Sequence, residues 1–391
     1  MIVAVIHATF APFHHQRLQT AGKLGHARGY RVSAIEIADS QNDYRWPRGL
    51  THKTHCQHMT LFPGSDYWSL SYRRIRHAVH GALDKLQPDV VVLPGWGFRE
   101  SLAGLGWCLR RGVARVLVSD SHPPDNPQTP IRMLLKGLLA RRFQVGFGGG
   151  KPHVRYLARL GLPPDRCVVG CDVVDNELFA EGSRRWTANR PPPTKQPSLF
   201  SALRLLPRKN VLAVLEVLAS SAPEWTWTIA GDGPHRAEIE SKIARLDLGK
   251  RVQLVGHVDY FDLPRHYAQS HVYLQPSLSE PWGLAVNEAM ASGLPVAVSR
   301  QCGCHEDLVQ DGVNGITFEA KSHESIAAAL RTLLHDRHRW AEMGQASQRI
   351  ISGWGLELYA RNLWQACETA LSTPARGAKE KVVGKALSLA L

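Results

Sequence analysis

The sequence predicts an α/β protein with two doubly wound parallel-sheet domains, and three observations support this class. The chain opens with an apolar strand, MIVAVIHA, followed by a helix over residues 13–27 and a second strand, YRVSAIEIA; this is the unit from which parallel sheets are built. The length of 391 residues allows two domains, each with its own core. Three consecutive prolines at residues 191–193 interrupt the alternation of strands and helices, which then resumes.

Apolar runs and turn residues predict the remaining elements in order. In the first half we expect helices over residues 72–86, from 99 onward and over 131–142, with buried strands beginning near residues 89, 114 and 145. Residues 40–65 are polar and irregular, so we expect no regular element there. In the second half strands and helices alternate from residue 197, and a long helix is expected over residues 357–371.

These elements give a domain division with a linker and a tail. We expect a first Rossmann-like domain over residues 1–185 and a second over residues 199–352. The linker between them covers residues 186–198, because its prolines stiffen the chain and prevent regular pairing. Residues 353–372 form the last helix, and residues 373–391 form a basic tail that we expect to be disordered.

Charge is distributed unevenly along the chain. The whole sequence has 47 Lys and Arg against 34 Asp and Glu, a net charge of +13, and residues 1–190 contribute 26 cations and 14 acids to it. A basic half fits nucleic acid, an anionic bilayer or a phosphate-bearing substrate, and a soluble surface rich in arginine is the alternative. Residues 131–142, an apolar helix carrying Arg132, Lys136, Arg141 and Arg142, are the best candidate for contact with a membrane surface. A core helix with basic ends would explain this segment as well.

The cysteines and the N-terminus favour the cytoplasm, with contact at the inner face of the cell membrane as an additional expectation. Seven scattered cysteines do not form a disulfide framework. Cys302, Cys304 and His305 lack the paired spacing of a structural zinc site, so we expect no metal. The first strand has no basic region or cleavage site of a signal peptide, and no run approaches the roughly 18 apolar residues of a membrane span.

Residues 277–299 contain the most informative motif of the sequence, SLSEPWGLAVNEAMASGLPVAVS. Glu280 lies in a loop, Gly283 opens a short helix, and Glu288 lies just over one turn along that helix. The free N–H groups and positive dipole end of a helix suit a phosphate group. A carboxylate on the first turns suits sugar hydroxyls, because it accepts two hydrogen bonds. This stretch therefore predicts a site for a phosphorylated sugar compound.

The two acids eight residues apart, joined to EAMASGLPV, closely resemble the donor-site segment of family 4 glycosyltransferases. The resemblance covers most of residues 151–372 and the first 150 residues only in outline. It implies the GT-B fold, in which two Rossmann-like domains face each other across a cleft and the last helix crosses back to the N-terminal domain. It also implies that Arg204 and Lys209, five residues apart at a strand-to-helix turn, grip the donor diphosphate; two cations and a helix N-terminus can neutralise two phosphates.

The resemblance implies roles for further residues. Glu280 would hold the hydroxyls of the transferred sugar and Glu288 those of the ribose, while a histidine near the position of His122 often contacts the donor sugar. The expected catalytic residues are thus Glu280, Arg204, Lys209 and His122. The expected donor-binding residues are Glu288, Gly283, Leu284, Trp282, Gly231, Gly256 and His257.

The activity implied is retaining transfer of a hexose-type sugar from a nucleotide-diphosphate sugar to a glycan or polyprenyl-linked acceptor, as in bacterial surface polysaccharide synthesis. We expect no cofactor and no metal, because no D-x-D motif is present and protein cations would offset the leaving diphosphate. A sugar-nucleotide epimerase of similar fold is an alternative. A nucleic-acid-binding protein would account for the charge, but it would leave Arg204, Lys209, Glu280 and Glu288 without a role, and no nucleic-acid-binding motif is present.

Overall fold

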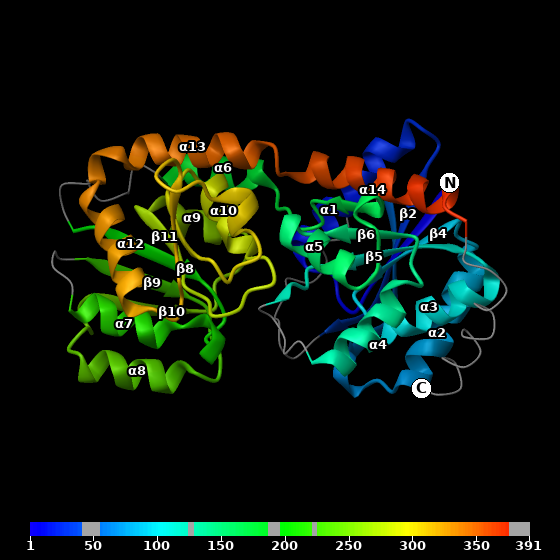
Figure 1. Ribbon diagram of the computed structural model, residues 1–391, viewed down its shortest axis with the longest axis horizontal. Helices are drawn as coiled ribbons and strands as arrows, with labels where there is room; N and C mark the ends of the chain where they lie inside the picture. Colours follow the sequence, from blue (N-terminus) through cyan, green and yellow to red (C-terminus); the bar gives the residue numbers. More distant parts are fainter. Residues whose placement is uncertain (41–54, 124–128, 187–195, 221–224, 375–391) are drawn as a thin grey trace. The chain divides into compact units, whose positions relative to one another are not determined.

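The computed structural model describes residues 1–40, 55–123, 129–186, 196–220 and 225–374 (Figure 1). The chain forms two compact units. Unit 1 comprises Met1–Val173 together with Leu356–Leu391, and unit 2 comprises Val174–Gly355. Each unit has its own parallel sheet and hydrophobic core, so the predicted fold class is confirmed.

Unit 1 contains a seven-stranded sheet in the order β3-β2-β1-β4-β5-β6-β7, in which all pairs are parallel. Its strands are β1 (Ile2–His7), β2 (Arg31–Ser40), β3 (Cys56–Asp66), β4 (Val90–Pro94), β5 (Ala114–Ser119), β6 (Val145–Gly148) and β7 (Cys167–Val169). The central strands are buried on both faces, because helices cover both sides of the sheet.

The helices of unit 1 are α1 (Pro12–His26), α2 (Tyr72–Leu86), α3 (Arg99–Arg111), α4 (Pro130–Ala140), α5 (Lys151–Arg159) and α14 (Leu356–Ser372), with short 3₁₀ turns at Tyr67–Ser69 and Pro164–Arg166. In Figure 1, α1 and α14 lie on one face of the sheet and α2 and α3 on the other. The indole of Trp364 on α14 donates to the carbonyl of Ala21 on α1 at 2.9 Å. The same ring occupies the place where a side chain on Gly25 would project, so the small residues of α1 allow the last helix to pack in unit 1.

Unit 2 contains a six-stranded parallel sheet in the order β10-β9-β8-β11-β12-β13. Its strands are β8 (Ser198–Ala202), β9 (Thr226–Ala230), β10 (Val252–Gly256), β11 (Val272–Gln275), β12 (Val296–Ser299) and β13 (Gly315–Phe318). Its helices are α6 (Asn176–Trp186), α7 (Val211–Ala219), α8 (Arg236–Arg245), α9 (Leu263–Ala268), α10 (Leu284–Ala291), α11 (His305–Leu308), α12 (His323–His335) and α13 (Trp340–Ser352), with 3₁₀ turns at Pro207–Lys209 and Arg337–Arg339.

The core of unit 2 accommodates two tryptophans on and beside β9. Trp225 and Trp227 are fully buried, and both indole N–H groups have partners: Trp225 donates to the carbonyl of Leu218 at 3.1 Å, and Trp227 donates to the hydroxyl of Ser201 at 3.0 Å. These hydrogen bonds offset the cost of removing the indole N–H groups from water, so such large side chains can be buried.

Two expectations about the fold were wrong. Residues 56–66, expected to be irregular, form the edge strand β3, which pairs with β2. An edge strand tolerates polar residues and Pro63, because one of its sides makes no sheet hydrogen bonds. Residues 174–185, expected in the first domain, belong to unit 2, where α6 packs against α9 and α10. A hydrogen bond of 3.4 Å from the Ser183 hydroxyl to the carbonyl of Pro264 joins α6 to α9.

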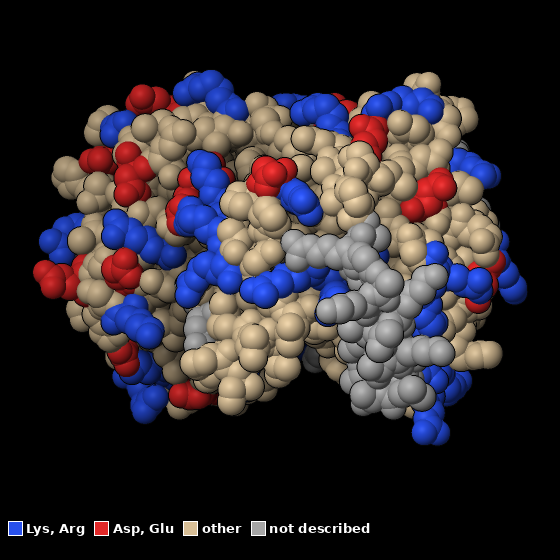
Figure 2. All heavy atoms as spheres, turned by 45° about the vertical axis from the view of Figure 1, so that its right-hand side comes forward, with Lys and Arg blue, Asp and Glu red and all other residues tan. Residues whose placement is uncertain are grey.

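Other expectations fall partly outside the described residues. Most of the expected linker, residues 187–195, and most of the expected tail, residues 375–391, lie there. Lys and Arg side chains outnumber Asp and Glu side chains on the face drawn in Figure 2, in line with the charge of +13. None of the helices in the described part of the chain combines the length and apolar composition that a bilayer span requires.

Candidate active site

The strand order of unit 2 reverses between β8 and β11, and the loops after these strands lie next to each other. Parallel sheets bind ligands at the carboxyl ends of their strands where the order reverses. The loop after β8 carries Arg204, Arg208 and Lys209, and the loop after β11 carries Glu280. A backbone hydrogen bond of 2.8 Å from the Leu278 amide to the carbonyl of Arg208 ties the two loops together.

Lys209 and Glu280, 71 residues apart in the sequence, form a buried ion pair between these loops. The Lys209 ammonium donates to Oε2 of Glu280, and both residues are less than one-tenth exposed. The same oxygen accepts from the amide of Gln275 at 3.1 Å and from the hydroxyl of Ser277 at 3.2 Å. Three donors therefore fix the position of the Glu280 carboxylate and balance its charge.

Arg208 adds a second cation beside this pair. Its Nη1 donates to the carbonyl of Ser279 at 2.9 Å and lies 3.9 Å from Oε1 of Glu280. The side chain of Arg208 is about two-fifths exposed, so the pair lies next to a solvent-accessible positive charge. Arg208 was not among the predicted site residues, because the prediction used only the spacing of Arg204 and Lys209.

The backbone around Arg204 is held against the turn after β9. The amides of Leu203 and Leu205 donate to the carbonyls of Ala230 and Asp232, each at 2.9 Å. Gly231, with φ of 134°, lies so close that a Cβ there would be 1.9 Å from the Leu203 carbonyl oxygen. Only glycine fits at this position.

Gly231 also links this turn to the end of β10. Its amide donates to the carbonyl of Gly256 at 2.6 Å, and Gly256 has a positive φ of 76°. His257 follows with a half-exposed side chain whose Nε2 lies 3.5 Å from Asp259. The structure thus brings three predicted positions, Arg204, Gly231 and Gly256, together through the backbone.

Gly283, the N-cap of α10, has a left-handed conformation, with φ of 105°. Gly283 has no side chain that could cap this N-terminus, so the first amides of the helix, beginning with Leu284, suit an anion. Trp282 was predicted to bind the donor, but its side chain is buried. It is 2% exposed, its indole donates to Asn287 at 2.9 Å, and its ring stacks on Trp354 at 5.5 Å. Its side chain therefore anchors the loop in unit 2.

Glu288 lies on α10 and is 6% exposed. Its Oε2 accepts a hydrogen bond of 2.7 Å from the hydroxyl of Tyr267 on α9. Burial raises the pKa of Glu288 to about 7, although the bond from Tyr267 opposes this rise. Glu288 therefore titrates in the physiological range, and its buried tyrosine partner is a residue that the sequence argument missed.

In unit 1, His122 follows β5 and lies at the carboxyl edge of the sheet. It is 3% exposed, and its ring stacks on that of His153, which follows β6, at 5.4 Å. The backbone amide of Gly150, the residue just before α5, donates to Nδ1 of His153 at 2.9 Å. His122 thus shares a buried imidazole stack with a residue whose relevance the sequence spacing did not reveal.

The strand order of unit 1 reverses between β1 and β4, and buried titratable groups gather at this point. Glu100 at the start of α3 is fully buried and accepts from the hydroxyl of Tyr67 at 2.8 Å; burial raises the pKa of Glu100 to about 7. The rings of His7 and His14 lie 4.6 Å apart, and burial lowers the pKa of His7 to about 3. Because these histidines are neutral, this edge of unit 1 suits uncharged hydroxyl groups better than a bare anion.

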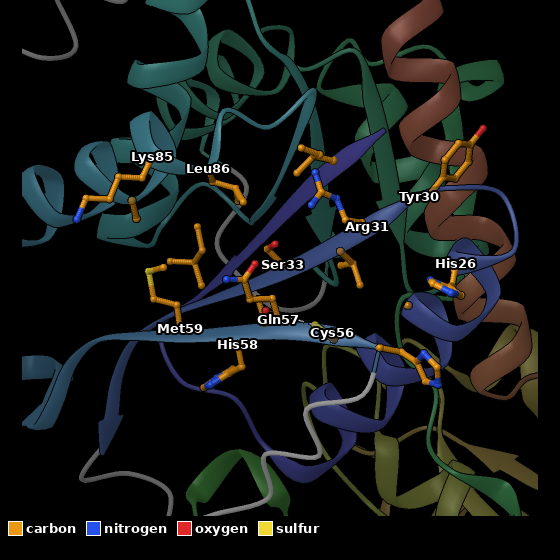
Figure 3. Close-up of a pocket in the computed structure, with 17 residues that line it drawn as sticks. His26, Tyr30, Arg31, Ser33, Cys56, Gln57, His58, Met59, Lys85 and Leu86 are labelled. Carbon is orange, nitrogen blue, oxygen red and sulfur yellow. Dashed lines mark hydrogen bonds between the residues drawn. The ribbon is translucent and has the colours of Figure 1, made fainter.

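A separate cavity of about 830 Å³ lies in unit 1 (Figure 3). It is lined by the first residues of β2 and β3, including Arg31, Ser33 and Gln57, and by His26 and Lys85 at the ends of α1 and α2. It therefore lies at the amino ends of the strands, opposite to the edge where parallel sheets bind ligands. None of the predicted site residues lines it, so it is not part of the candidate active site.

Within the described ranges, no cluster of three or more His, Cys, Asp or Glu side chains is arranged to hold a metal ion. Cys302 and Cys304 are fully buried, and His305 contacts the backbone carbonyl of Cys302 through Nδ1 at 2.8 Å. Burial raises the pKa of the Cys304 thiol, so this group stays protonated beside the Gly283 turn.

Comparisons with known proteins show what this sequence and this fold resemble. Residues 183–350 match the family described as Glycosyl transferases group 1. The chain is 34% identical over 139 residues to the sulfoquinovosyl transferase SQD2 of Arabidopsis thaliana, covering 35% of this chain and 26% of that protein. It is 26% identical over 284 residues to a GDP-mannose-dependent α-(1-6)-phosphatidylinositol monomannoside mannosyltransferase of Mycolicibacterium smegmatis, covering 67% of this chain and 71% of that protein. The chain thus spans only about a quarter of the length of the plant relative.

The fold also resembles a solved structure, Anabaena HepE in complex with UDP-glucose, with a TM-score of 0.72 and 20% identity over 95% of this chain and 100% of that chain. The likeness expected from residues 277–299 is therefore confirmed, as is the fold expected with it. Residues 183–350 of this chain, which has the GT-B fold, thus resemble the family described as Glycosyl transferases group 1.

Proposed function

We propose that this protein is a retaining glycosyltransferase that moves a hexose-type sugar from a nucleotide-diphosphate sugar to a glycan or lipid-linked acceptor. The observation that carries the proposal is the Lys209–Glu280 pair, which joins the two loops at the strand-order reversal inside the family segment. The names of the relatives support the donor class, since one is GDP-mannose-dependent and one similar fold was solved with UDP-glucose.

The donor would bind to unit 2 through groups of complementary charge. Arg204 and Lys209 would face the diphosphate, together with the amides at Gly283 and Leu284. Glu288 would accept hydrogen bonds from the ribose hydroxyls, and the backbone near Gly231 and Gly256 would lie beside the nucleobase, with His257 at its rim. Most of these groups come from loops at the carboxyl ends of β8 to β11, while Leu284 and Glu288 lie on α10, which follows the loop after β11.

Glu280 would bind the hydroxyls of the transferred sugar. Its carboxylate already accepts from Lys209, Gln275 and Ser277, so it is positioned as a binding group and is poorly suited to attack the sugar as a nucleophile. In this arrangement the ion pair would also hold the Lys209 charge next to the point where the sugar meets the diphosphate. His122 on unit 1 is proposed to contact the donor sugar.

In the reaction, the bond between the anomeric carbon and the phosphate oxygen breaks, and its electrons pass to the diphosphate. The acceptor oxygen bonds to the same face of that carbon and gives its proton to the departing phosphate. Negative charge on the diphosphate grows as the bond breaks, and the cations and helix amides stabilise it without moving. In this scheme the protein's own charges perform the neutralisation, and no metal ion takes part.

A glycan or polyprenyl-linked acceptor of surface polysaccharide synthesis fits a basic, cytoplasmic enzyme working at the inner face of the membrane. The neutral histidines at the β1–β4 reversal, His7 at the end of β1 and His14 on α1, would offer hydrogen bonds to acceptor hydroxyls. We place acceptor recognition on unit 1 for this reason.

Radiolabelled UDP-glucose and GDP-mannose would test the proposal. Each is incubated with the protein alone and with a solvent extract of bacterial lipid-linked glycans, and the label entering the lipid phase is counted. We expect transfer only when the extract is present, from one of the two donors, and an α-linked product from these α-linked donors by nuclear magnetic resonance. A product of inverted configuration would exclude retention. Label that stays on the nucleotide as an epimeric sugar would instead identify an epimerase.

A further inference from the structure

Helix α4 of unit 1 exposes a continuous apolar stripe. Ile131, Leu134, Leu135 and Leu138 are 72%, 62%, 56% and 47% exposed. Their spacing of three, four and seven residues places all four on one side of the helix. A helix at a protein surface normally turns such a stripe toward the core, so α4 is oriented in the opposite sense.

The orientation of α4 is fixed by the contacts on its other face. Gly137 packs so closely on the carbonyl of Leu160 that a Cβ there would lie 3.1 Å from its oxygen. The hydroxyl of Tyr156 lies 3.6 Å from the sulfur of Met133 and 3.1 Å from the ammonium of Lys136, which also lies 5.7 Å from the centre of the Trp96 ring. Met133, Gly137 and Leu139 thus attach the helix to unit 1, and the four aliphatic side chains of the stripe face solvent.

Positive charge surrounds the stripe. Residues 129–144 contain four cations, Arg132, Lys136, Arg141 and Arg142, and no acid. At 3.6 residues per turn, Arg132 and Arg141 fall on opposite sides of the stripe. Both residues are exposed. A partner that covers α4 must therefore be apolar at its centre and anionic on both sides.

We propose that α4 docks on the surface of an anionic lipid bilayer, with its four aliphatic side chains in the boundary between headgroups and acyl chains. Helices that lie in a membrane interface combine a Leu- and Ile-rich face with Lys and Arg beside it. The helix has 11 residues and a length of about 16 Å, so it lies on the bilayer and does not cross it. This inference does not rest on the proposed sugar transfer.

A second copy of the chain fits this surface less well. The stripe exposes on the order of a few hundred Å², whereas a stable protein interface takes about 800 Å² from each partner. The cores of such interfaces are enriched in aromatic residues, while this stripe is purely aliphatic. Two copies would also bring like charges together at Arg132 and Arg141. A bilayer needs no matching shape and supplies the opposite charge.

Vesicle flotation with the full chain tests the inference. Vesicles of phosphatidylcholine alone are compared with vesicles containing equal parts of phosphatidylglycerol and phosphatidylcholine. We expect at least tenfold stronger partitioning onto the anionic vesicles, and at least a tenfold loss when Leu134→Gln and Leu138→Gln are combined. The matched control combines Val313→Gln and Leu371→Gln, which are 46% and 49% exposed elsewhere on the surface and should leave partitioning unchanged. Circular dichroism confirms that both double variants are folded.

Three outcomes would overturn the inference. The first is equal recovery on both kinds of vesicle, and the second is flotation of the α4 double variant at the level of wild type. The third is association of the wild type in lipid-free analytical ultracentrifugation that the α4 double variant abolishes, because a second copy would then be the partner.

Discussion

Glu288 offers a prediction whose size follows from the structure. We consider Glu288→Gln, in which the amide keeps an acceptor oxygen for the Tyr267 hydroxyl but cannot ionise. Burial raises the pKa of Glu288 from 4.5 to about 7 in the folded protein. A shift of one pKa unit between the unfolded and the folded state corresponds to about 1.4 kcal/mol. The folded state therefore disfavours the ionised Glu288 carboxylate by roughly 3 kcal/mol.

The direction of the effect follows from proton binding. The folded protein holds the Glu288 proton more tightly than the unfolded chain, so this contribution to stability is complete below pH 4.5 and is lost as the pH rises to about 7. Glu288→Gln cannot ionise, so its stability does not fall with pH for this reason. We therefore expect the free energy of unfolding of Glu288→Gln, relative to wild type, to be more favourable at pH 8 than at pH 5 by about 2–3 kcal/mol.

Urea unfolding followed by tryptophan fluorescence measures this difference at the two pH values, with equal denaturant slopes as the condition for comparing proteins. Tyr267→Phe serves as a second variant. Because the Tyr267 hydroxyl holds the pKa of Glu288 down, its removal should move the pH-dependent step to higher pH. A stability difference between Glu288→Gln and wild type that is the same at pH 5 and pH 8 would refute the argument from burial.

The same titration should control donor binding if Glu288 holds the ribose. With a pKa of about 7, the ionised fraction rises from about one-tenth at pH 6 to about nine-tenths at pH 8, so affinity for the donor should rise roughly tenfold. Calorimetry with UDP-glucose and GDP-mannose is suitable, since their diphosphates do not change charge in this range. The tenfold step should be absent in Glu288→Gln, and a step of equal size in the variant would exclude Glu288 as its origin.

Further predictions concern the loops and unit 1. Arg204→Ala or Lys209→Ala should slow sugar transfer by about 30- to 1,000-fold, equivalent to roughly 2–4 kcal/mol of transition-state stabilisation; rates within twofold of wild type would contradict their role at the diphosphate. Gly231→Ala should weaken nucleotide binding at least tenfold by calorimetry, because its Cβ would collide with the Leu203 carbonyl and displace the loop that carries Arg204; unchanged affinity would show that the loop can adapt. His122→Asn should lower the turnover rate and leave UDP affinity unchanged, since His122 belongs to unit 1; a parallel loss of UDP binding would contradict that division.

The Lys209–Glu280 pair illustrates how far a motif can be followed from sequence. The spacing of Arg204 and Lys209 and that of Glu280 and Glu288 were each visible, and each predicted a group of known chemistry. Their contact was not visible, because it depends on β8 and β11 being neighbours in the sheet although three helices and two strands separate them in the chain. Gln275 and Ser277, which complete the set of donors to Glu280, could have been noticed as polar residues at the end of a buried strand and just after it.

Trp282 shows the reverse case. Trp282 lies between Glu280 and Glu288 in the sequence, and a ligand contact was predicted for it. Its indole donates to Asn287 and stacks on Trp354, which is near the C-terminal end of unit 2 in the sequence. Side-chain direction in an irregular loop depends on which partners are near, and those partners were 5 and 72 residues away. The residues next to Trp282 in the sequence therefore do not predict the direction of its side chain.

The sequence by itself determined the alternation of strands and helices, the class of the fold and the short helix that begins at Gly283, because these depend on side-chain periodicity and on the backbone freedom of glycine over a few residues. Only the tertiary structure decided that β3 completes an edge, that α6 joins unit 2, that α14 packs on Ala21 and Gly25, and that α4 turns its leucines outward. Each of these outcomes is set by contacts between segments distant in the chain. The free energy of such contacts depends on which surfaces meet, and periodicity within one segment does not specify its partner.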